Sequence, residues 1–497
     1  MFFELKYYLK LLCLVGGICF CPQMALAKNV KSVAELPLEW RNPVPRMQEL
    51  GFDWRQLETL IDEKMMLLVH PLSRYELPGK KGRLVEFNSA RAVTAFAVID
   101  APLGEVKKVV SGYERYVEFM PRTTASNIIQ QSGRHTIVAY VLNFKIPLID
   151  IDIKYLLQHT EEENGDLSVL MLEGDMKGGA SRWEFVALEN NKTLLMYTNW
   201  NDVESVGLVF KTVVKAQPEM KLTSPVLSAA LAVEAVQEYF MDSSKPIPKA
   251  KIISESNAAP KPTATVNKTD SIILGSVSEP RVPSYQQENI PLLRTLTRVG
   301  IVLFIHPAQT VRIENEITEL MFVTVLGGVN GGLDEVKNLS TEFMRYPEYF
   351  RQVARVREIE AEQGKEVDWY YRFGFGIISI PLRYSLAYRW QNDNQLLFDR
   401  VAGDIDYIVG GLEWVAINEV ETLSFYTSAI ALKESPSWVM TMVKQMPKLA
   451  MIGGVSFGIM VMENQLPWIE AMIQGVEYRP TWKREKKRRS SRPSRRR

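Results

Sequence analysis

The chain has 497 residues, a length that fits two to three globular domains. Its apolar content of 46% is typical of globular proteins and excludes a chain too polar to bury a core. Its net charge of +1 conceals a split, because residues 483–497 carry ten Lys or Arg and one Glu, a balance of +9 that leaves −8 for the rest. All three cysteines lie within the first 21 residues, so a chain that loses this segment cannot be held together by disulfides.

The N-terminus has the features of a secretory signal peptide. Lys6 and Lys10 give a weakly basic start, and an apolar run follows from Leu11 to Phe20. Small residues at 25–27 predict cleavage after Ala27. The apolar run is shorter than the ~20 residues of a membrane-spanning helix, although an uncleaved N-terminal anchor is the alternative. We therefore expect an exported, periplasmic protein whose signal peptide is residues 1–27.

The remainder of the chain contains two similar copies of one long segment. The segment from about Leu67 to Tyr239 recurs from about Leu303 to Glu470, and from Gly174 onward the offset is 229 residues. A repeat of this length is a duplicated domain, because solenoid units have only ~20–50 residues. The expected organisation is a lead-in (28–60), a first domain (61–241), a flexible linker rich in Ser, Pro and Ala (242–291), a second domain (292–474) and a disordered basic tail (475–497).

Each copy shows the same succession of predicted elements. A strand (92–99 or 319–326) precedes a first helix and a second, short helix (113–119 or 343–350). About six strands follow, with Gly, Asn and Asp in their turns, which is typical of an antiparallel sheet. A long apolar helix closes each copy, at about 218–240 and 447–472. This order predicts an α+β fold in which a curved antiparallel sheet packs against the C-terminal helix and leaves an apolar cavity beside it.

The order of elements and one motif resemble the START-like, helix-grip superfamily, in particular its polyketide cyclase and coenzyme-Q-binding branch. The motif comprises Ala101-Pro102 before the first helix and the string from Tyr113 to Pro121, with Tyr116 and Phe119 inside it. The second copy departs from it, with Gly331-Gly332 and Phe350-Arg351 at these places. The resemblance implies two tandem helix-grip domains, each with a hydrophobic cavity, and it implies no particular reaction.

Large apolar residues on the strands and closing helices are the expected lining of these cavities. The candidates are Tyr140, Phe144, Trp183, Phe185, Tyr197, Leu227, Tyr239, Trp390, Leu412, Trp414, Phe425, Met446, Met451 and Phe457. The methionines suit a soft, variable occupant, although they are equally common as core filler. Arg115 and Arg345 recur at matched places on the second helix, where they would meet an anionic head group at the entrance or form part of a solvated helix face.

The titratable residues do not form a recognisable catalytic set. Only His70 and His306 are matched between the copies, and packing at a domain entry is expected for them rather than acid–base chemistry. Asp175 and Asp404 are expected to bond nearby backbone in turns, with an acid at the cavity mouth as the alternative. Strand alternation predicts that Glu184 and its counterpart Glu413 face away from the cavity. No metal-ligand spacing is visible, so neither a metal nor a cofactor is expected.

Helix breakers recur in the C-terminal helices. Pro218 and Ser224-Pro225 of the first copy correspond to Pro447 and Gly453-Gly454 of the second. Either the helix of the first copy begins late, at Pro225, or the breakers form a gate that bends to admit a ligand.

These features together predict an exported binder or carrier of lipid-like molecules, such as a lipid or a quinone, across the cell envelope. The basic tail would contact an anionic membrane surface, and nucleic acid is not an expected partner behind an export signal. The alternative is a cyclase or dehydratase acting on a polyketide-like or isoprenoid substrate, which requires an inward-facing acid or base. A third interpretation is a scaffold in which Trp183, Phe185, Leu412 and Trp414 fill both cavities.

Overall fold

The computed structural model shows an α+β protein with a large antiparallel sheet and few helices, which confirms the α+β part of the predicted fold class. The predicted signal peptide, most of the predicted linker and the basic run 483–497 lie outside the residues that the structure describes. The described residues are 42–61, 64–78, 84–146, 149–206, 220–241, 280–283, 285, 287–313, 316–361, 364–375, 378–431 and 448–480. We refer to 42–241 as the first half and to 280–480 as the second half.

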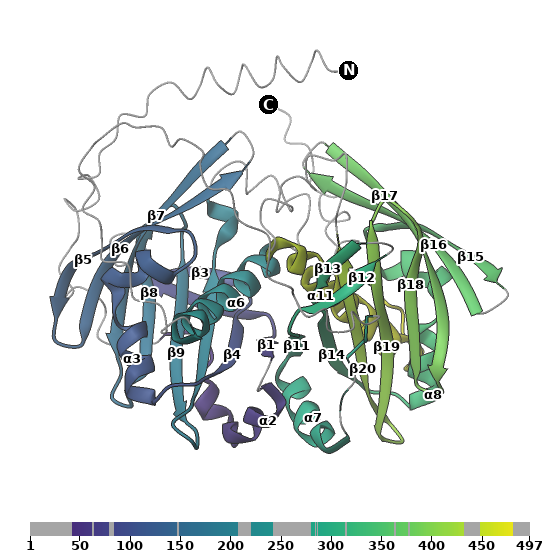
Figure 1. Ribbon diagram of the computed structural model, residues 1–497, viewed down its shortest axis with the longest axis horizontal. Coiled ribbons are helices and arrows are strands. Elements are labelled where there is room, and N and C mark those ends of the chain that lie inside the picture. The colour runs from purple at the N-terminus through teal and green to yellow at the C-terminus, as the bar shows by residue number, and fades with distance from the viewer. Residues whose placement is uncertain are drawn as a thin grey trace, which may run out of the picture.

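Sixteen strands form one continuous sheet that runs from β5 at one edge to β15 at the other (Figure 1). The first half contributes β1 (Met65–Val69), β4 (Val93–Ile99), β5 (Thr123–Ser132), β6 (His135–Ile146), β7 (Ile149–Glu161), β8 (Leu167–Gly174), β9 (Gly179–Ala187) and β10 (Thr193–Asn201). The second half contributes β11 (Ile301–Ile305), β14 (Val323–Val329), β15 (Val353–Ala361), β16 (Gly364–Phe375), β17 (Ile378–Asn392), β18 (Gln395–Gly403), β19 (Tyr407–Asn418) and β20 (Glu421–Ala431). Two hairpins form separate small sheets, β2 (Ser73–Pro78) with β3 (Leu84–Ala90) and β12 (Gln309–Ile313) with β13 (Glu316–Leu320).

The two halves join at the centre of the sheet, where β1 pairs antiparallel with β11. Met65 lies opposite Ile305 and Val69 opposite Ile301, so that Leu67 meets Leu303 at the midpoint. Because Leu67 and Leu303 are also the matched starting points of the repeat, each strand pairs with its own counterpart, as identical subunits do across a twofold axis. Both strands are almost wholly apolar, as expected of strands covered on both faces.

Three strands of each half were not predicted. β1 and β11 are five-residue apolar runs without the alternation that identifies a half-buried strand, and the hairpins β2–β3 and β12–β13 follow them. Because of these additional strands, His70 and His306 directly follow the first strand of each half, β1 or β11, and do not mark the entry to the half. The six strands expected after the short helices are all present, as β5–β10 and β15–β20.

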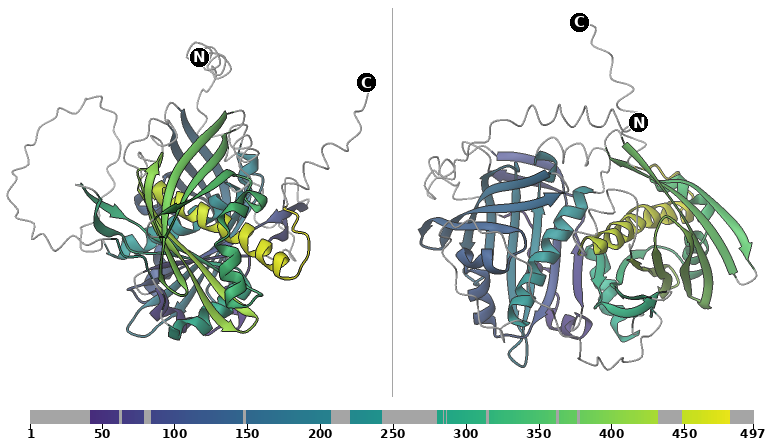
Figure 2. Two further views of the ribbon diagram at one scale, coloured as in Figure 1. Left: turned by 90° about the vertical axis from the view of Figure 1, so that its right-hand side faces the viewer. Right: turned by 45° about the horizontal axis from the view of Figure 1, so that its top comes forward.

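Two long helices, α6 (Met220–Met241) and α11 (Lys448–Ile473), lie against one face of the sheet, which we call the inner face (Figures 1 and 2). α6 packs on β4 and β10, α11 packs on β14 and β20, and the two helices contact each other. A Cβ atom on Gly458 would clash with Val325 of β14, so this glycine lets α11 approach the sheet closely. Pro225 lies inside α6, so the helix does not begin there, and the predicted late start is wrong.

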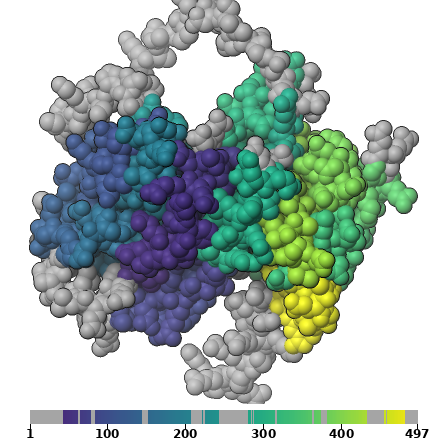
Figure 3. All heavy atoms as spheres, turned by 90° about the horizontal axis from the view of Figure 1, so that it is seen from below, coloured from purple at the N-terminus to yellow at the C-terminus, as the bar shows by residue number. Residues whose placement is uncertain are grey.

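The opposite, outer face is covered at the centre of the sheet by the segments that precede each half. These are η3 (Met47–Leu50), η4 (Trp54–Gln56) and α2 (Leu57–Ile61) in the first half, and η8 (Gln287–Asn289) and α7 (Ile290–Val299) in the second. The two sets of segments lie side by side in Figure 3, where purple meets teal. They close one apolar cluster that includes residues of β1 and β11, so the two halves share a core across the joint.

Short helices follow β4 and β14 in the predicted order. They are α3 (Leu103–Val110), η6 (Tyr113–Arg115) and α4 (Tyr116–Phe119), and their counterparts α8 (Leu333–Ser340), η9 (Phe343–Arg345) and α9 (Tyr346–Tyr349); η7 (Val203–Ser205) follows β10. The Tyr116 hydroxyl donates to the Val110 carbonyl at 2.6 Å, and Tyr346 donates to Ser340 at 3.0 Å. These matched buried bonds fix the second short helix against the first in each half.

Candidate ligand-binding site

Strand alternation turns a row of large side chains in the first half toward the inner face. The row includes Tyr140 on β6, Tyr155 and Leu157 on β7, Trp183 on β9 and Tyr197 on β10. The rings of Trp183 and Tyr197 stack with their centroids 4.0 Å apart. We call this row the inner wall of the first half; it is apolar and aromatic over most of its extent.

Packing does not close this inner wall. Tyr155, Leu157 and Tyr197 are only half-buried, although their strands lie well inside the sheet. Elsewhere on the same sheet Leu195 of the inner face and Phe96 of the outer face are both 0% exposed, so the partial exposure is confined to this part of the wall. A tightly packed interior leaves few spaces as large as a water molecule. The partial exposure of these three side chains indicates that packing leaves this part of the inner wall incompletely covered, which is the condition for a ligand to bind there.

The second half has the same inner wall with less accessible surface. The residues 229 positions after Tyr155, Leu157 and Tyr197 are Tyr384, Leu386 and Tyr426, and they are 6%, 4% and 7% exposed. Several ring pairs fill this interior, with centroid separations from 4.4 to 5.5 Å; they are Phe343–Tyr388, Tyr349–Trp468 and Tyr371–Tyr384. Bulky aromatic side chains thus occupy more of the interior in the second half than in the first.

A histidine lies within the inner wall of the first half. His159 on β7 is buried, its Nε2 lies 3.0 Å from the Tyr140 hydroxyl, and its ring lies 4.1 Å from that of Tyr113. Burial lowers the pKa of His159 to about 3, so the ring is neutral at physiological pH. Its other nitrogen, Nδ1, has no hydrogen-bond partner within the described part of the chain.

The sequence interpretation missed His159 as a candidate because no histidine matches it in the second copy. The residue 229 positions later is Tyr388, and Trp369 stands in the place of Tyr140. Sheet pairing confirms this correspondence, since His159 pairs with Val169 while Tyr388 pairs with Phe398. The alternation of β7, with Tyr155 and Leu157 on the same face, was the signal that could have identified it.

The two arginines predicted at the entrance connect the second short helix to the long C-terminal helix. Arg115 donates to the Tyr239 hydroxyl at 2.9 Å, and its guanidinium lies 5.3 Å from the centre of that ring. Arg345 lies 4.6 Å from the ring centre of Trp468, which stands 229 positions after Tyr239. Each half therefore holds the same contact between an arginine and an aromatic ring, which we call the latch.

Replacing the latch arginine of the second half, Arg345→Met, is expected to lower the free energy of unfolding by only about 0.5–1 kcal/mol, since cation–π contacts at exposed sites are weak. The local effect is expected to be larger, with faster hydrogen exchange of backbone amides around Trp468 in α11. Hydrogen exchange with mass spectrometry measures both halves at once. Arg74→Met, at an ion pair on the β2–β3 hairpin, serves as control, and unchanged exchange in α11 would contradict the role of the latch.

Most of the described residues that were predicted to line the cavities lie on the inner walls or on α6. Tyr140, Trp183, Phe185, Tyr197, Leu412 and Trp414 lie on the walls, while Leu227 and Tyr239 are half-buried on α6. The indole N–H of Trp414 donates to the Ser340 hydroxyl at 3.2 Å. The side chains of Phe144, Met446, Met451 and Phe457 lie outside the described residues.

One of these predictions requires correction. Phe425 belongs to the apolar cluster on the outer face that the two halves share, and its ring centroid lies 5.0 Å from that of Tyr285. It therefore cannot line an inner cavity. Its neighbour Tyr426, the true counterpart of Tyr197, occupies that place, because adjacent residues of a strand face opposite sides. Trp390 lies on the inner side of β17 but near the end of the strand, and it is 52% exposed.

The matched histidines take part in a buried polar ladder on the outer face. Nε2 of His70 lies 2.8 Å from the Thr94 hydroxyl, which lies 2.8 Å from that of Thr198. In the second half, His306 contacts Thr324 at 2.9 Å, and Thr324 contacts Thr427 at 2.9 Å. Burial lowers the pKa of His70 to about 4 and that of His306 to about 3. Both histidines therefore have the packing role that the sequence predicted.

The matched acidic residues also bond backbone. Asp175 accepts from the Lys154 N–H and Asp404 from the Arg383 N–H, each at 2.7 Å, which agrees with their predicted role in turns. Glu413, the counterpart of Glu184, has its pKa raised by burial.

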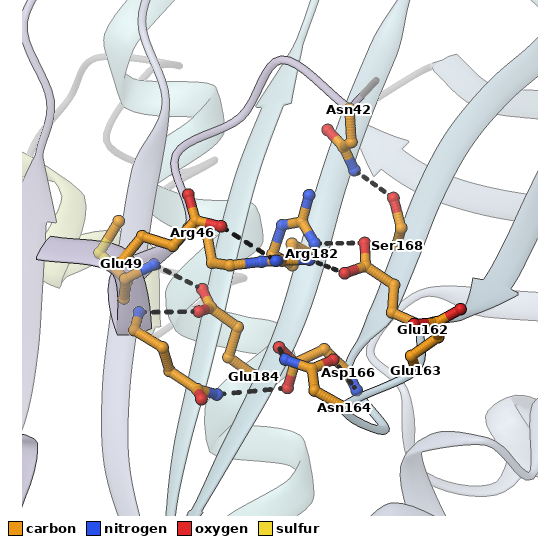
Figure 4. A network of polar contacts seen from close by, with 12 residues as sticks. Asn42, Arg46, Glu49, Glu162, Glu163, Asn164, Asp166, Ser168, Arg182 and Glu184 are labelled. Atoms are coloured by element: carbon orange, nitrogen blue, oxygen red, sulfur yellow. Dashed lines mark hydrogen bonds and ion pairs between the residues drawn. The ribbon is translucent and has the colours of Figure 1, made fainter. Parts of the chain in front are cut away.

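Glu184 lies on the outer face as predicted, but it is fully buried beneath the lead-in (Figure 4). Its carboxylate accepts from the backbone N–H groups of Met47 at 2.9 Å and Gln48 at 3.0 Å. Burial raises the pKa of Glu184 to about 7, against the opposing effect of these two bonds. An ion pair between Arg46 and Glu162 lies in the same network, which fastens the lead-in to the sheet.

Among the described residues, no group of three or more His, Cys, Asp or Glu side chains is arranged to hold a metal ion. None of the helices within the described ranges is long and apolar enough to cross a membrane.

Comparison with known proteins gives only distant structural likenesses. No family model and no curated protein sequence matches the chain. The di-domain aromatase/cyclase StfQ from the steffimycin biosynthetic pathway is 10% identical with a TM-score of 0.24, and the match covers 75% of this chain and 97% of that one. The Zhui aromatase/cyclase from Streptomyces sp. R1128 is 15% identical (TM-score 0.28, covering 32% and 99%). A STAR-related lipid transfer protein from Xanthomonas axonopodis is 14% identical (TM-score 0.23, covering 34% and 99%).

Proposed function

We propose that the protein is an exported carrier of lipid-like hydrophobic molecules, built from two tandem helix-grip domains whose curved sheets wrap around their C-terminal helices. The observation that supports it best is the inner wall of the first half, where Tyr155, Leu157 and Tyr197 are only half-buried. Apolar surface of this kind is stabilised when an apolar molecule covers it and releases the water in contact with it.

The composition of the wall suits a ligand with both rings and chains. The half-buried aromatic rings of Tyr155 and Tyr197 suit contact with a planar group, for example the ring of a quinone. Burying an alkyl or isoprenoid tail adds about 0.8 kcal/mol for each CH₂ group, so a long tail binds without specific polar contacts. Lipids and quinones both meet these requirements.

The two ends of the sequence support a role in the cell envelope. Residues 1–27 have the features of a cleaved export signal, and residues 483–497 carry a balance of +9. A basic run gains about 1 kcal/mol per Lys or Arg close to an anionic membrane surface. Transient attachment through this run would bring the carrier to the membrane from which it takes its ligand.

A cyclase or dehydratase is the second candidate, because His159 is an inward-facing base of the kind that such an enzyme requires. General acid–base catalysis is most effective when the pKa of the group lies near the working pH. The pKa of His159 is about 3, which makes it a weak base and favours binding over proton transfer. Turnover of a polyketide-like substrate that is lost in His159→Phe would reverse this preference.

Mature protein, beginning at Lys28 and purified without detergent from cells that export it, is expected to carry a co-purified lipid or quinone. Native mass spectrometry would show a mass above that of the polypeptide, and solvent extraction would release and identify the ligand. A preparation in which every molecule has the bare polypeptide mass, and from which solvent extracts nothing, would contradict the proposal.

A pair of matched variants tests where the ligand lies. Leu157→Trp places a large ring on the accessible wall of the first half and is expected to remove most of the co-purified ligand. Leu386→Trp changes the corresponding position of the second half, where little accessible surface remains. Equal ligand content in Leu157→Trp and in the unaltered protein would exclude this wall as the site.

A further inference from the structure

The two copies differ most in chemistry around one place on the inner wall. In the first half it is formed by Tyr113, Tyr140 and His159, and in the second half the matched residues are Phe343, Trp369 and Tyr388. The ring contacts are conserved in kind, since Tyr113 lies 4.1 Å from His159 and Phe343 lies 4.4 Å from Tyr388. The architecture is therefore duplicated, while the imidazole exists only in the first half.

This imidazole is held in a fixed orientation. The Tyr140 hydroxyl lies 3.0 Å from Nε2, and the Tyr113 ring lies against the imidazole face. Nδ1 is left without a hydrogen-bond partner among the described residues, in a side chain that is only 3% exposed. A buried polar atom without a partner costs free energy, so a ligand group that reaches Nδ1 and supplies the missing bond gains affinity there.

The state of the ring determines which group Nδ1 can bind. A neutral imidazole carries one proton, so Nδ1 donates if the Tyr140 hydroxyl donates to Nε2, and it accepts if Nε2 donates to Tyr140. A hydroxyl group can both accept and donate, and so it fits either tautomer. A charged group would lose its hydration between aromatic side chains, where burying a charge is far more costly than burying a hydroxyl.

We propose that the two halves have different specificities: the first half selects apolar ligands that carry a neutral hydroxyl group, which hydrogen-bonds Nδ1 of His159. The second half offers at this place the phenol of Tyr388 and the indole N–H of Trp369, whose Nε1 also has no hydrogen-bond partner among the described residues but can only donate, whereas Nδ1 of the imidazole can donate or accept. Its wall is also less accessible, as Tyr384 and Tyr426 are 6% and 7% exposed. The inference rests on the proposed binding function and assigns its polar selectivity to the first half.

Two probes of nearly equal shape test this selectivity. 1-Naphthol and 1-methylnaphthalene differ only in a hydroxyl and a methyl group, and calorimetric titration of the full-length mature protein gives the affinity of each. The unaltered protein is expected to bind 1-naphthol about two- to tenfold more tightly, the range that one net hydrogen bond provides. Failure of both probes to bind would contradict the proposed function itself, whereas equal affinities would overturn only the selectivity.

Variants locate the selectivity at one residue. His159→Phe is expected to remove the preference by weakening 1-naphthol binding two- to tenfold, with the affinity for 1-methylnaphthalene unchanged. Tyr388→Phe, the matched change in the second half, is expected to alter neither affinity. His159→Asn retains a polar amide near the position of Nδ1 and is expected to preserve part of the preference. A preference that persists undiminished in His159→Phe would overturn the inference.

A measurement on the unaltered protein does not depend on the folding of any variant. The sequence contains four histidines, so ¹⁵N labelling of histidine gives a small set of imidazole signals. Addition of 1-naphthol is expected to shift the Nδ1 signal of His159, and 1-methylnaphthalene is expected to leave it nearly unchanged. Equal shifts with both probes, or a shift confined to the signals of His70 and His306 on the outer face, would also overturn the inference.

Discussion

Acidification from pH 7 to pH 5 is expected to lower the free energy of unfolding by about 3–4 kcal/mol. The cause lies in three buried histidines, because the pKa of His70 is about 4 and those of His159 and His306 are about 3, all below the value of 6.5 in the unfolded chain. Between these values the unfolded chain binds protons that the folded chain does not. Their stabilising contribution is therefore complete above about pH 6.5 and is lost as the pH falls, by about 5–6 kcal/mol in total at pH 5.

Glu184 acts in the opposite direction. Its pKa is raised to about 7 in the folded protein, so the folded chain binds a proton that the unfolded carboxylate releases, and acidification to pH 5 stabilises the fold by about 2 kcal/mol. Urea unfolding followed by circular dichroism at pH 7 and pH 5 measures the net effect. His306→Gln is expected to reduce the loss by about 2 kcal/mol, and Glu184→Gln to enlarge it by a similar amount. Equal free energies of unfolding of the unaltered protein at the two pH values would contradict the shifted pKa values of the buried histidines and Glu184.

The substitutions Leu67→Ala and Leu303→Ala are each expected to lower the free energy of unfolding by about 2–5 kcal/mol, as is usual for a fully buried leucine. Both side chains are 0% exposed, and they lie opposite each other at the midpoint of the joint between β1 and β11. Because the two residues occupy equivalent positions, their effects are expected to be nearly equal. Leu72→Ala serves as control, since Leu72 is 62% exposed and its loss should change stability by less than about 0.5 kcal/mol.

The same joint predicts how the protein unfolds. The sheet is continuous, and the outer cluster contains residues of both halves, among them Met66 and Phe304. Calorimetry is therefore expected to show a single transition, which both alanine substitutions move to lower temperature without splitting it. Two separate transitions, of which each substitution moves only one, would show that the halves unfold as independent domains.

The strands after the short helices could be predicted because their turns carry strong local signals, such as the Glu163–Asp166 turn between β7 and β8. The joint could not be predicted in this way. β1 and β11 are apolar runs of five residues that fit either a buried strand or a helix segment. Their pairing is also a contact across more than 200 residues, which no local pattern specifies.

The residues of the candidate site were harder to predict for a different reason. The choice of Phe425 instead of Tyr426 was an error of one residue, and in a strand such an error exchanges the inner and outer faces. The repeat offset of 229 residues identifies Tyr426 as the counterpart of Tyr197, and it could have placed Tyr426 on the inner wall. His159 was missed for the opposite reason: repeated residues were favoured as candidates, and His159 is not repeated in the second copy.

The symmetric pairing of β1 with β11 has a consequence for the history of the chain. A single ancestral copy with this strand at its edge would have bound a second copy through the same surface, as a homodimer with two identical sites. Fusion of two such copies into one chain would fix their one-to-one ratio and would remove the requirement that every mutation act on both. The imidazole of His159 in one copy and the phenol of its counterpart Tyr388 in the other form a difference that a homodimer encoded by one gene could never have acquired.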